Sequence, residues 1–168
     1  QVSDVRVLVI GTGGMANNHV EAYAKIAGVR VVAGVDTNPA RLAAFIQKHG
    51  ISRGFGSVTE ALAWGEFDAV SNVTPDAIHH RTTLPLLAAG KHVLCEKPLA
   101  ANAADAAEMA EAAAQVGVVN MVNLSYRNVP ALMQAAEIVA AGQIGAVRHF
   151  EASYLQSWLT QPSWGDWK

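Results

Sequence analysis

A lysine stands at the end of a short apolar run in this sequence, where a buried strand would be expected to finish. The run His92–Leu94 is followed by Cys95, Glu96, Lys97 and Pro98. An unperturbed lysine has a pKa of about 10.4 and is a poor base at neutral pH. A neighbouring carboxylate such as Glu96 makes loss of the proton harder, whereas burial makes it easier. We therefore expect Lys97 mainly to position and polarise a substrate oxygen; the structural alternative is a lysine that only pairs with Glu96.

A second group of residues has the spacing of a phosphate-binding turn. The first predicted strand, Val5–Ile10, leads into Gly11-Thr12-Gly13-Gly14-Met15-Ala16, which matches the pattern G-x-G-x-x-G/A between a strand and a helix. In this pattern Gly11 allows the tight turn, Gly13 lets a diphosphate approach the backbone, and the small Ala16 permits close packing of the helix on the strand. The glycines alone are a weak signal, because glycine turns end many strands.

An acidic residue follows at the distance that this turn requires. Asp36 ends the second apolar run, twenty residues after Ala16, and could accept hydrogen bonds from ribose hydroxyls. Together the two features predict a dinucleotide site, and the carboxylate favours NAD over NADP because it repels a 2′-phosphate. Arg41 could attract that phosphate, but we expect it to face solvent from the next helix. The structural alternative is that Asp36 or Asn38 simply caps that helix.

The elements that would position these residues alternate along the chain. Short β-branched runs are followed by Ala-rich stretches of helical period, which predicts successive βαβ units and an α/β fold: a Rossmann-type, doubly wound parallel sheet. The predicted strands lie near 5–10, 29–35, 68–73, 91–95 and 118–122, and the helices near 14–27, 39–49, 57–64, 76–89 and 102–116. Pro85 falls inside the fourth helix and predicts a kink or an early break.

The pattern changes after residue 123. Residues 123–145 read as one helix with loops, and residues 146–158 alternate like a long strand with one buried face. We therefore expect a dinucleotide-binding domain over 1–123 and, over 124–168, the incomplete beginning of an α+β substrate and oligomerisation domain. Trp158, Trp164 and Trp167 would need an apolar surface in the rest of that domain, on a neighbouring subunit or on a sugar ring.

Composition excludes several classes of partner. The formal net charge is −2 and only 15% of the 168 residues are charged, so we expect no nucleic-acid partner. No apolar run approaches the roughly 20 residues that a membrane span requires. The single cysteine, Cys95, is expected to be a small core residue, and with no secretion signal recognisable it favours the cytoplasm. His79 and His80 are adjacent, so they diverge on a helix, and we expect no metal site.

Five segments together resemble one enzyme family. The segments "GTGGMA", "VDTNPAR", "TPDAIHH", "AAGKHVLCEKPLA" and "QIGAVRHFEASY" are similar to those of the glucose-fructose oxidoreductase / inositol dehydrogenase / MocA family, over essentially the whole chain. The resemblance implies an NAD(P)-dependent oxidoreductase that transfers a hydride between a nicotinamide cofactor and a hydroxyl or carbonyl of a sugar, inositol or related polyol. It also implies a two-domain subunit in a homo-oligomer, a dimer or tetramer, built through a sheet in the second domain.

The resemblance assigns roles to particular residues. Lys97 matches the lysine that contacts the reacting oxygen, and Glu96 and Pro98 match the residues that fix it. The remaining matches are Thr74, Pro75 and His79 beside the nicotinamide ribose, and Asn123 with Arg127 in a segment that re-enters the site. Asp76 stands where the family commonly has asparagine, so a helix N-cap is at least as good an interpretation of it.

Similar enzymes carry an Asp and a His for proton relay in the second domain, and no matching motif occurs before Lys168. We therefore expect the cofactor site to be largely complete here and the chain alone to be inactive. The alternatives are a non-catalytic NAD-binding sensor or scaffold, and a methyltransferase, which would leave Glu96-Lys97-Pro98 unexplained. His19, in the first predicted helix, is expected to be structural.

Overall fold

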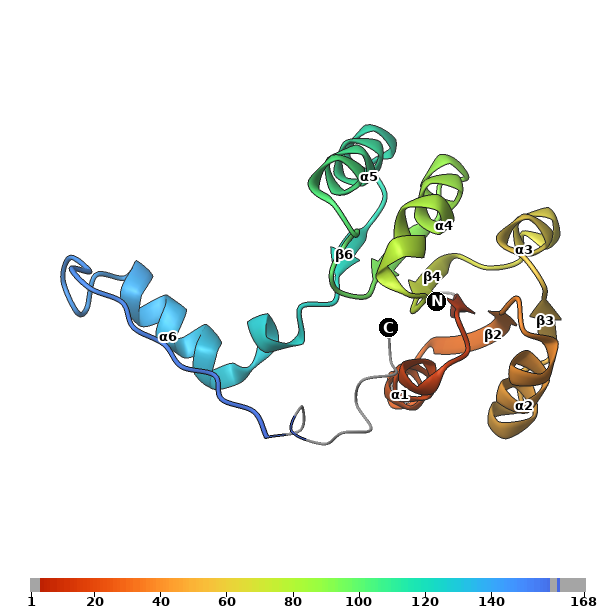
Figure 1. Cartoon of the computed structure of the whole chain (residues 1–168), viewed down its shortest axis with the longest axis horizontal. Helices are drawn as coiled ribbons and strands as arrows, with labels where there is room; N and C mark the ends of the chain where they lie inside the picture. The colour runs from red at the N-terminus through yellow and green to blue at the C-terminus, as the bar shows by residue number, and fades with distance from the viewer. Residues whose placement is uncertain (1–3, 158–159, 161–168) are drawn as a thin grey trace. The chain divides into compact units, whose positions relative to one another are not determined.

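The computed structural model describes residues 4–157 and residue 160. The chain divides into two compact units, Gln1–Leu124 and Ser125–Lys168. Figure 1 colours the chain by residue number, so each segment can be found from its position in the sequence. Each unit is described by itself below.

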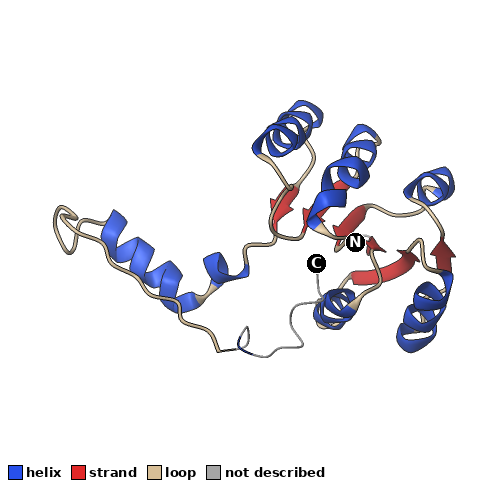
Figure 2. Ribbon diagram, in the orientation of Figure 1, coloured by secondary structure: helices blue, strands red, loops and turns tan. Residues whose placement is uncertain are grey.

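The first unit is built on a six-stranded parallel sheet with the strand order β3-β2-β1-β4-β5-β6. The order reverses between β1 and β4, which is the switch point where ligands bind to open α/β sheets. The strands are β1 Val5–Ile10, β2 Val29–Val35, β3 Arg53–Phe55, β4 Ala69–Asn72, β5 His92–Cys95 and β6 Asn120–Val122. The helices are α1 Gly14–Tyr23, α2 Pro39–His49, α3 Val58–Trp64, α4 Asp76–Ala88 and α5 Ala103–Val116. The predicted doubly wound α/β fold is confirmed (Figure 2).

Helices cover both faces of this sheet because neighbouring strand residues point to opposite sides. On β1, Val9 packs in one cluster with Ala16 and Val20 of α1 and Phe45 of α2. Leu8 and Ile10 instead join a larger cluster to which α3, α4 and α5 contribute, through Ala61, Leu86, Leu87, Met109 and Ala113. Residues 7–10 of the central strand β1 are thus buried from both sides, as their continuous apolar run predicts.

Local sequence signals set most helix boundaries. Asn38 caps α2 by accepting a hydrogen bond of 3.0 Å from the Arg41 amide, and Pro39 occupies the first turn. Gly50 and Gly117 end α2 and α5 in the left-handed conformation. The prediction that the first helix reaches residue 27 was too long, because after Tyr23 the chain tightens into i→i−3 turn bonds from Lys25 and Ile26.

Two further elements differ from the prediction. Strand β3 was not predicted, since its sequence Arg53-Gly54-Phe55 has neither length nor β-branching, and pairing with β2 is what defines it. Helix α4 runs through Pro85 to Ala88, so the early break is wrong. Proline removes one backbone hydrogen bond there, and the complete burial of Leu86 and near-complete burial of Leu87 offset that loss.

The second unit contains the short 3-10 helix η1, Ser125–Asn128, and the helix α6, Pro130–Ala140. The predicted strand over 146–158 does not form in its described part, residues 146–157, because no described segment pairs with it. Within this unit the hydroxyls of Tyr126 and Tyr154 are hydrogen-bonded and their rings meet edge to face. Trp158, Trp164 and Trp167 lie outside the described residues.

Two features that the described residues lack bear on the function. None of their helices has the length and apolar character needed to cross a bilayer. In the same part of the chain, no three His, Cys, Asp or Glu side chains come together as metal ligands would.

Candidate functional site

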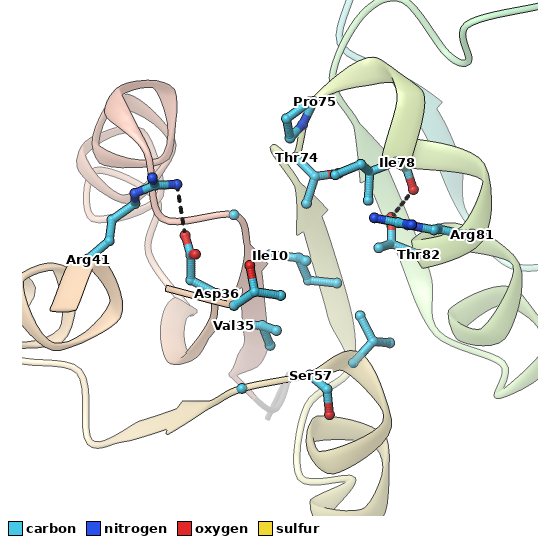
Figure 3. A pocket seen from close by; sticks show the side chains of 14 residues that line it. Ile10, Val35, Asp36, Arg41, Ser57, Thr74, Pro75, Ile78, Arg81 and Thr82 are labelled. Carbon is cyan, nitrogen blue, oxygen red and sulfur yellow. Dashed lines mark hydrogen bonds and ion pairs between the residues drawn. The ribbon is translucent and has the colours of Figure 1, made fainter. Parts of the chain in front are cut away.

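A cavity of about 460 Å³ lies at the carboxyl ends of the central strands, on the side where β1 and β4 diverge. Its walls combine Ile10 at the end of β1, Gly11 after it, Asp36 after β2, and Thr74 with Pro75 after β4. Figure 3 shows the side chains of Ile10, Asp36, Thr74 and Pro75 around the cavity. Sequence segments far apart are brought together here because parallel strands end at the same edge of a sheet.

The glycine turn has the geometry that its sequence predicts. Gly11 has a φ of +82°, and a Cβ added there would lie 2.8 Å from the Val73 carbonyl oxygen. A side chain at Gly11 would therefore both strain the backbone and collide with the segment after β4. At Gly13 and Gly14, by contrast, no atom of the described residues lies within 4 Å of an added Cβ, so the space beside them is open.

Helix α1 begins at this open space. No described side chain caps its start, and its first turn contains no acidic residue, so its leading amides remain available to an anion. Ala16 is 1% exposed against Val9 and Val20, as its predicted packing role requires, whereas Met15 is exposed. The residues present therefore fit a diphosphate held by backbone amides.

Asp36 is buried beside the glycine turn rather than projecting freely. Its Oδ2 accepts hydrogen bonds from the Thr12 amide at 2.9 Å and the Thr12 hydroxyl at 2.7 Å, and its Oδ1 accepts one from the Asn38 amide at 2.8 Å. Burial opposes ionisation, but these hydrogen bonds and the nearby Arg41 lower the pKa of Asp36 overall. The carboxylate therefore stays charged at neutral pH and retains acceptor capacity on Oδ1.

Two arginines also line the cavity. The Arg41 Nη1 lies 3.7 Å from the Asp36 Oδ2, and Figure 3 shows Arg41 and Arg81 on opposite sides of the cavity. The Arg41 side chain is exposed, as expected, but the sequence interpretation missed its ion pair and missed Arg81 altogether. The first turn of α2 places Arg41 above the end of β2, and α4 contributes Arg81 only through the tertiary fold.

Asn72 shapes the turn that carries Thr74 and Pro75. This completely buried side chain donates hydrogen bonds to the Thr82 and Thr83 hydroxyls, at 2.8 and 3.0 Å, and its Oδ1 accepts one from the Thr74 hydroxyl at 2.7 Å. Sequence reasoning did not single it out as a network centre. Asp76 occupies the first position of α4 while Pro75 is the N-cap. The N-cap interpretation of Asp76 is therefore wrong.

His79 lies behind this wall rather than in it. Its ring is 1% exposed, with Nδ1 2.8 Å from the Pro98 carbonyl oxygen and Nε2 2.7 Å from the Thr74 carbonyl oxygen. Both ring nitrogens are thus occupied by backbone groups. The side chain links the turn after β4 to the loop that follows Lys97.

Glu96 is nearly buried, and its carboxylate is held by neighbours other than the Lys97 ammonium. Its Oε1 lies 2.9 Å from the His19 Nε2 and accepts a 2.6 Å hydrogen bond from Asn123, while its Oε2 accepts one from the Lys97 amide at 3.2 Å. Burial opposes ionisation, but the hydrogen bonds from Asn123, His19 and the Lys97 amide lower the pKa of Glu96 overall. His19 also contacts the Ser71 hydroxyl through Nδ1 at 2.7 Å. It is a structural residue, as expected, but the sequence did not indicate that it holds Glu96 in place.

Lys97 is exposed, and among the described residues no carboxylate lies within ion-pair distance of its ammonium. The alternative in which Lys97 pairs with Glu96 is therefore not what the structure shows. Cys95 is 1% exposed and burial raises the pKa of its thiol to about 11, as suits a core residue rather than a nucleophile. Arg127 is exposed and belongs to η1 of the second unit.

Comparisons with known proteins match this arrangement to one family. Residues 5–124 match the model described as "Oxidoreductase family, NAD-binding Rossmann fold". A 1,5-anhydro-D-fructose reductase of Ensifer adhaerens is 38% identical over 94% of this chain and 50% of its own length. A scyllo-inositol 2-dehydrogenase (NADP(+)) of Bacillus subtilis is 34% identical over 90% of this chain and 46% of its own. The chain thus spans about half the length of these relatives.

Solved structures of dehydrogenases are also similar to this chain. The WlbA dehydrogenase from Bordetella pertussis, in complex with NADH and UDP-GlcNAcA, superposes with a TM-score of 0.79 at 31% identity, over 84% of this chain and 43% of that one. Myo-inositol 2-dehydrogenase from Lactobacillus plantarum superposes with a TM-score of 0.78 at 25% identity, over 86% of this chain and 43% of that one.

Proposed function

This chain belongs to the oxidoreductase family with the NAD-binding Rossmann fold, and we propose that it is the cofactor-binding half of a dehydrogenase or reductase. The proposed reaction transfers a hydride between a nicotinamide cofactor and a hydroxyl or carbonyl carbon of a sugar, inositol or related polyol. The names of the similar proteins, which include a sugar reductase and an inositol dehydrogenase, support this substrate class. When bound, a nicotinamide dinucleotide supplies the hydride donor or acceptor.

One observation carries the proposal: the uncapped start of α1 opens beside Gly13, next to a buried, ionised Asp36. Backbone amides at Gly13, Gly14 and Met15 would hold the diphosphate, and the free acceptor site on Asp36 would receive a ribose hydroxyl. Thr74 and Pro75 would line the path toward the nicotinamide end, since they form the opposite wall of the same cavity.

Within this site we propose NAD as the preferred cofactor. The charged Asp36 repels a 2′-phosphate, and the ion pair with Asp36 already offsets part of the charge of Arg41. Arg41 nevertheless supplies a cation beside the ribose position, which supports residual binding of NADP. The similarity to a dehydrogenase named for NADP(+) is consistent with a small rather than an absolute preference.

Lys97 is the proposed catalytic residue, as a cation that positions and polarises the substrate oxygen. Its ammonium is exposed while the residues on both sides of it are held by buried histidines, Glu96 by His19 and Pro98 by His79. An anchored loop with a free lysine head is the arrangement that this role requires. Loss of the substrate hydroxyl proton would then fall to other groups, which we place in the second domain of the complete protein.

The second unit is proposed to begin the domain that binds substrate and joins subunits. Several of its apolar side chains on α6 and beyond are exposed, among them Leu132, Met133 and Phe150, and would be covered by the rest of such a domain or by another subunit. Asn123, which donates a hydrogen bond to Glu96, and Arg127 of η1 remain proposed members of the cofactor site. Assembly as a homo-oligomer remains part of the proposal.

Two measurements test the proposed function. Calorimetry on this chain should show binding of NAD, and the full-length protein should produce reduced nicotinamide absorbance with at least one member of a sugar and polyol panel. Absence of dinucleotide binding would refute the cofactor site. Binding of NAD with no turnover of any panel member would instead favour a non-catalytic sensor or scaffold.

A further inference from the structure

His79 makes a contact that neither its sequence context nor the proposed cofactor site explains. The ring is almost completely buried at 1% exposure, and each of its two nitrogens meets a backbone carbonyl oxygen. Nδ1 lies 2.8 Å from the oxygen of Pro98, and Nε2 lies 2.7 Å from the oxygen of Thr74. These distances are those of short hydrogen bonds.

The chemistry of the partners decides the protonation state of this ring. A carbonyl oxygen can only accept a hydrogen bond, and a neutral imidazole carries an N–H on one nitrogen and a lone pair on the other. A neutral His79 would therefore direct a lone pair at a carbonyl oxygen inside hydrogen-bond distance, without water to separate them. The imidazolium form has two N–H groups and satisfies both carbonyls at once.

One carbonyl belongs to the wall of the cavity and the other to the loop that carries Lys97. Thr74 follows β4 and lines the cavity, while Pro98 directly follows Lys97. We propose that His79 is a positioning residue, held as a buried imidazolium, that ties the cavity wall to the loop presenting Lys97. Its role in catalysis rests on the proposed function, whereas its charge state does not.

The charged groups on the elements packed around α4 are possible ion-pair partners for the His79 ring, but the described ones do not contact it. Glu96 is bound by His19 and Asn123, and Glu108 of α5 is bound by His80. Among the described residues, no carboxylate contacts the His79 ring. The other charged or titratable groups on α4, α5 and the loop after β5 are Asp76, Arg81, Lys97, Asp105 and Glu111. The two carbonyl dipoles are therefore the groups that directly solvate the charge.

His80 provides a matched control in the next position of the chain. It points the other way, with its Nε2 2.8 Å from the Glu108 carboxylate and its side chain 27% exposed. The two histidines thus share a helix, a sequence neighbourhood and a chemistry, but only His79 lies between backbone groups of the proposed site.

The direct test is spectroscopic and needs no substrate. The chain is labelled with ¹⁵N-histidine, and long-range ¹H–¹⁵N correlation spectra are recorded at pH 7, with His79 assigned by the peaks that His79→Gln removes. We expect both His79 ring nitrogens to show the shifts of protonated nitrogens, because each lies within hydrogen-bond distance of a carbonyl oxygen. A non-protonated nitrogen signal for His79 at pH 7 would overturn the imidazolium assignment, and this reading is made on the unmutated chain even if the variant folds poorly.

The positioning role is tested in the full-length enzyme with His79→Gln and His80→Gln. We expect His79→Gln to lower kcat about tenfold or more while KM for NAD changes less than about twofold, because the loop carrying Lys97 is displaced rather than the diphosphate turn. His80→Gln should keep the original kcat. An unchanged kcat in His79→Gln would overturn the positioning role. If the unmutated enzyme turned over no polyol, the proposed function would fail, while the nitrogen shifts would still decide the charge of His79.

Discussion

Arg41 places its Nη1 3.7 Å from the Oδ2 of Asp36, so the position expected to select the cofactor carries both signs of charge. The carboxylate is buried and held by the Thr12 and Asn38 amides, whereas the arginine side chain is exposed. The negative charge is therefore fixed and the positive charge can move. This asymmetry sets the direction of the first prediction.

Calorimetry on this chain should show tighter binding of NAD than of NADP, and Asp36→Asn should narrow the difference. Replacing the carboxylate by an amide removes the repulsion of a 2′-phosphate, so we expect NADP affinity to rise about tenfold relative to NAD, or roughly 1.4 kcal/mol. Arg41→Ala is the matched variant and should weaken NADP more than NAD. Tighter binding of NADP by the unmutated chain would contradict the assignment of Asp36.

Gly13→Val should abolish dinucleotide binding while leaving the fold intact. The backbone at Gly13 is extended, with φ −74°, and no described atom lies within 4 Å of an added Cβ. The valine would therefore collide with the bound diphosphate alone, at a cost in stability of about 1 kcal/mol for the poorer N-cap. We expect the dissociation constant for NAD to increase by about 100-fold or more in calorimetry.

Gly11→Ala is the contrasting control for that experiment. Its Cβ would meet the Val73 carbonyl oxygen at 2.8 Å, on a backbone with φ +82°. This variant should lose about 2 kcal/mol of unfolding free energy in urea titrations. Unchanged NAD affinity in Gly13→Val would show that the turn does not hold the diphosphate.

Lys97→Ala in the full-length enzyme should lower kcat by roughly 100-fold or more without a large change in NAD affinity. The side chain is exposed and the described residues give its ammonium no ion-pair partner, so its removal breaks no described ion pair. Steady-state kinetics combined with calorimetry would separate the two effects. Lys25→Ala, at an exposed position after α1, should keep the original rate, and a normal rate in Lys97→Ala would leave that lysine a structural residue.

Asp68→Asn should make the stability of the chain less sensitive to acid. Hydrogen bonds from the Arg6 side chain and amide lower the pKa of Asp68 to about 2 from its ordinary value of 3.8. Because the folded-state pKa is lowered, the stabilisation is present above about pH 4 and is lost as the pH falls toward 2. Asp68 is partly exposed, so we expect only about 0.5–1 kcal/mol at pH 7.

Urea midpoints measured from pH 7 down to pH 3 would check this expectation. The unmutated chain should lose stability more steeply below pH 4 than Asp68→Asn, after the common contribution of the other carboxylates is subtracted. Parallel curves for the two proteins would mean that the Arg6–Asp68 pair does not contribute to folding.

Most of the fold could be predicted because its signals are local. Apolar runs, helical periodicity and the caps at Asn38, Gly50 and Gly117 act within a few residues. Strand β3 and the missing strand at 146–157 show the opposite case. A strand is defined by its neighbour, so Arg53–Phe55 becomes one beside β2, while an alternating pattern without a described partner does not.

The candidate site divides in the same way. The glycine turn and Asp36 could be identified from the sequence, because a turn and the acid one strand later are parts of a single βαβ unit. The contact of His19 with Glu96, the bridge of His79 to Pro98 and the entry of Arg81 into the cavity depend on the order β1-β4-β5 in the sheet. Residues 77 positions apart, as His19 and Glu96 are, meet only because parallel strands bring their carboxyl ends to one edge, and no local pattern records which strands will be neighbours.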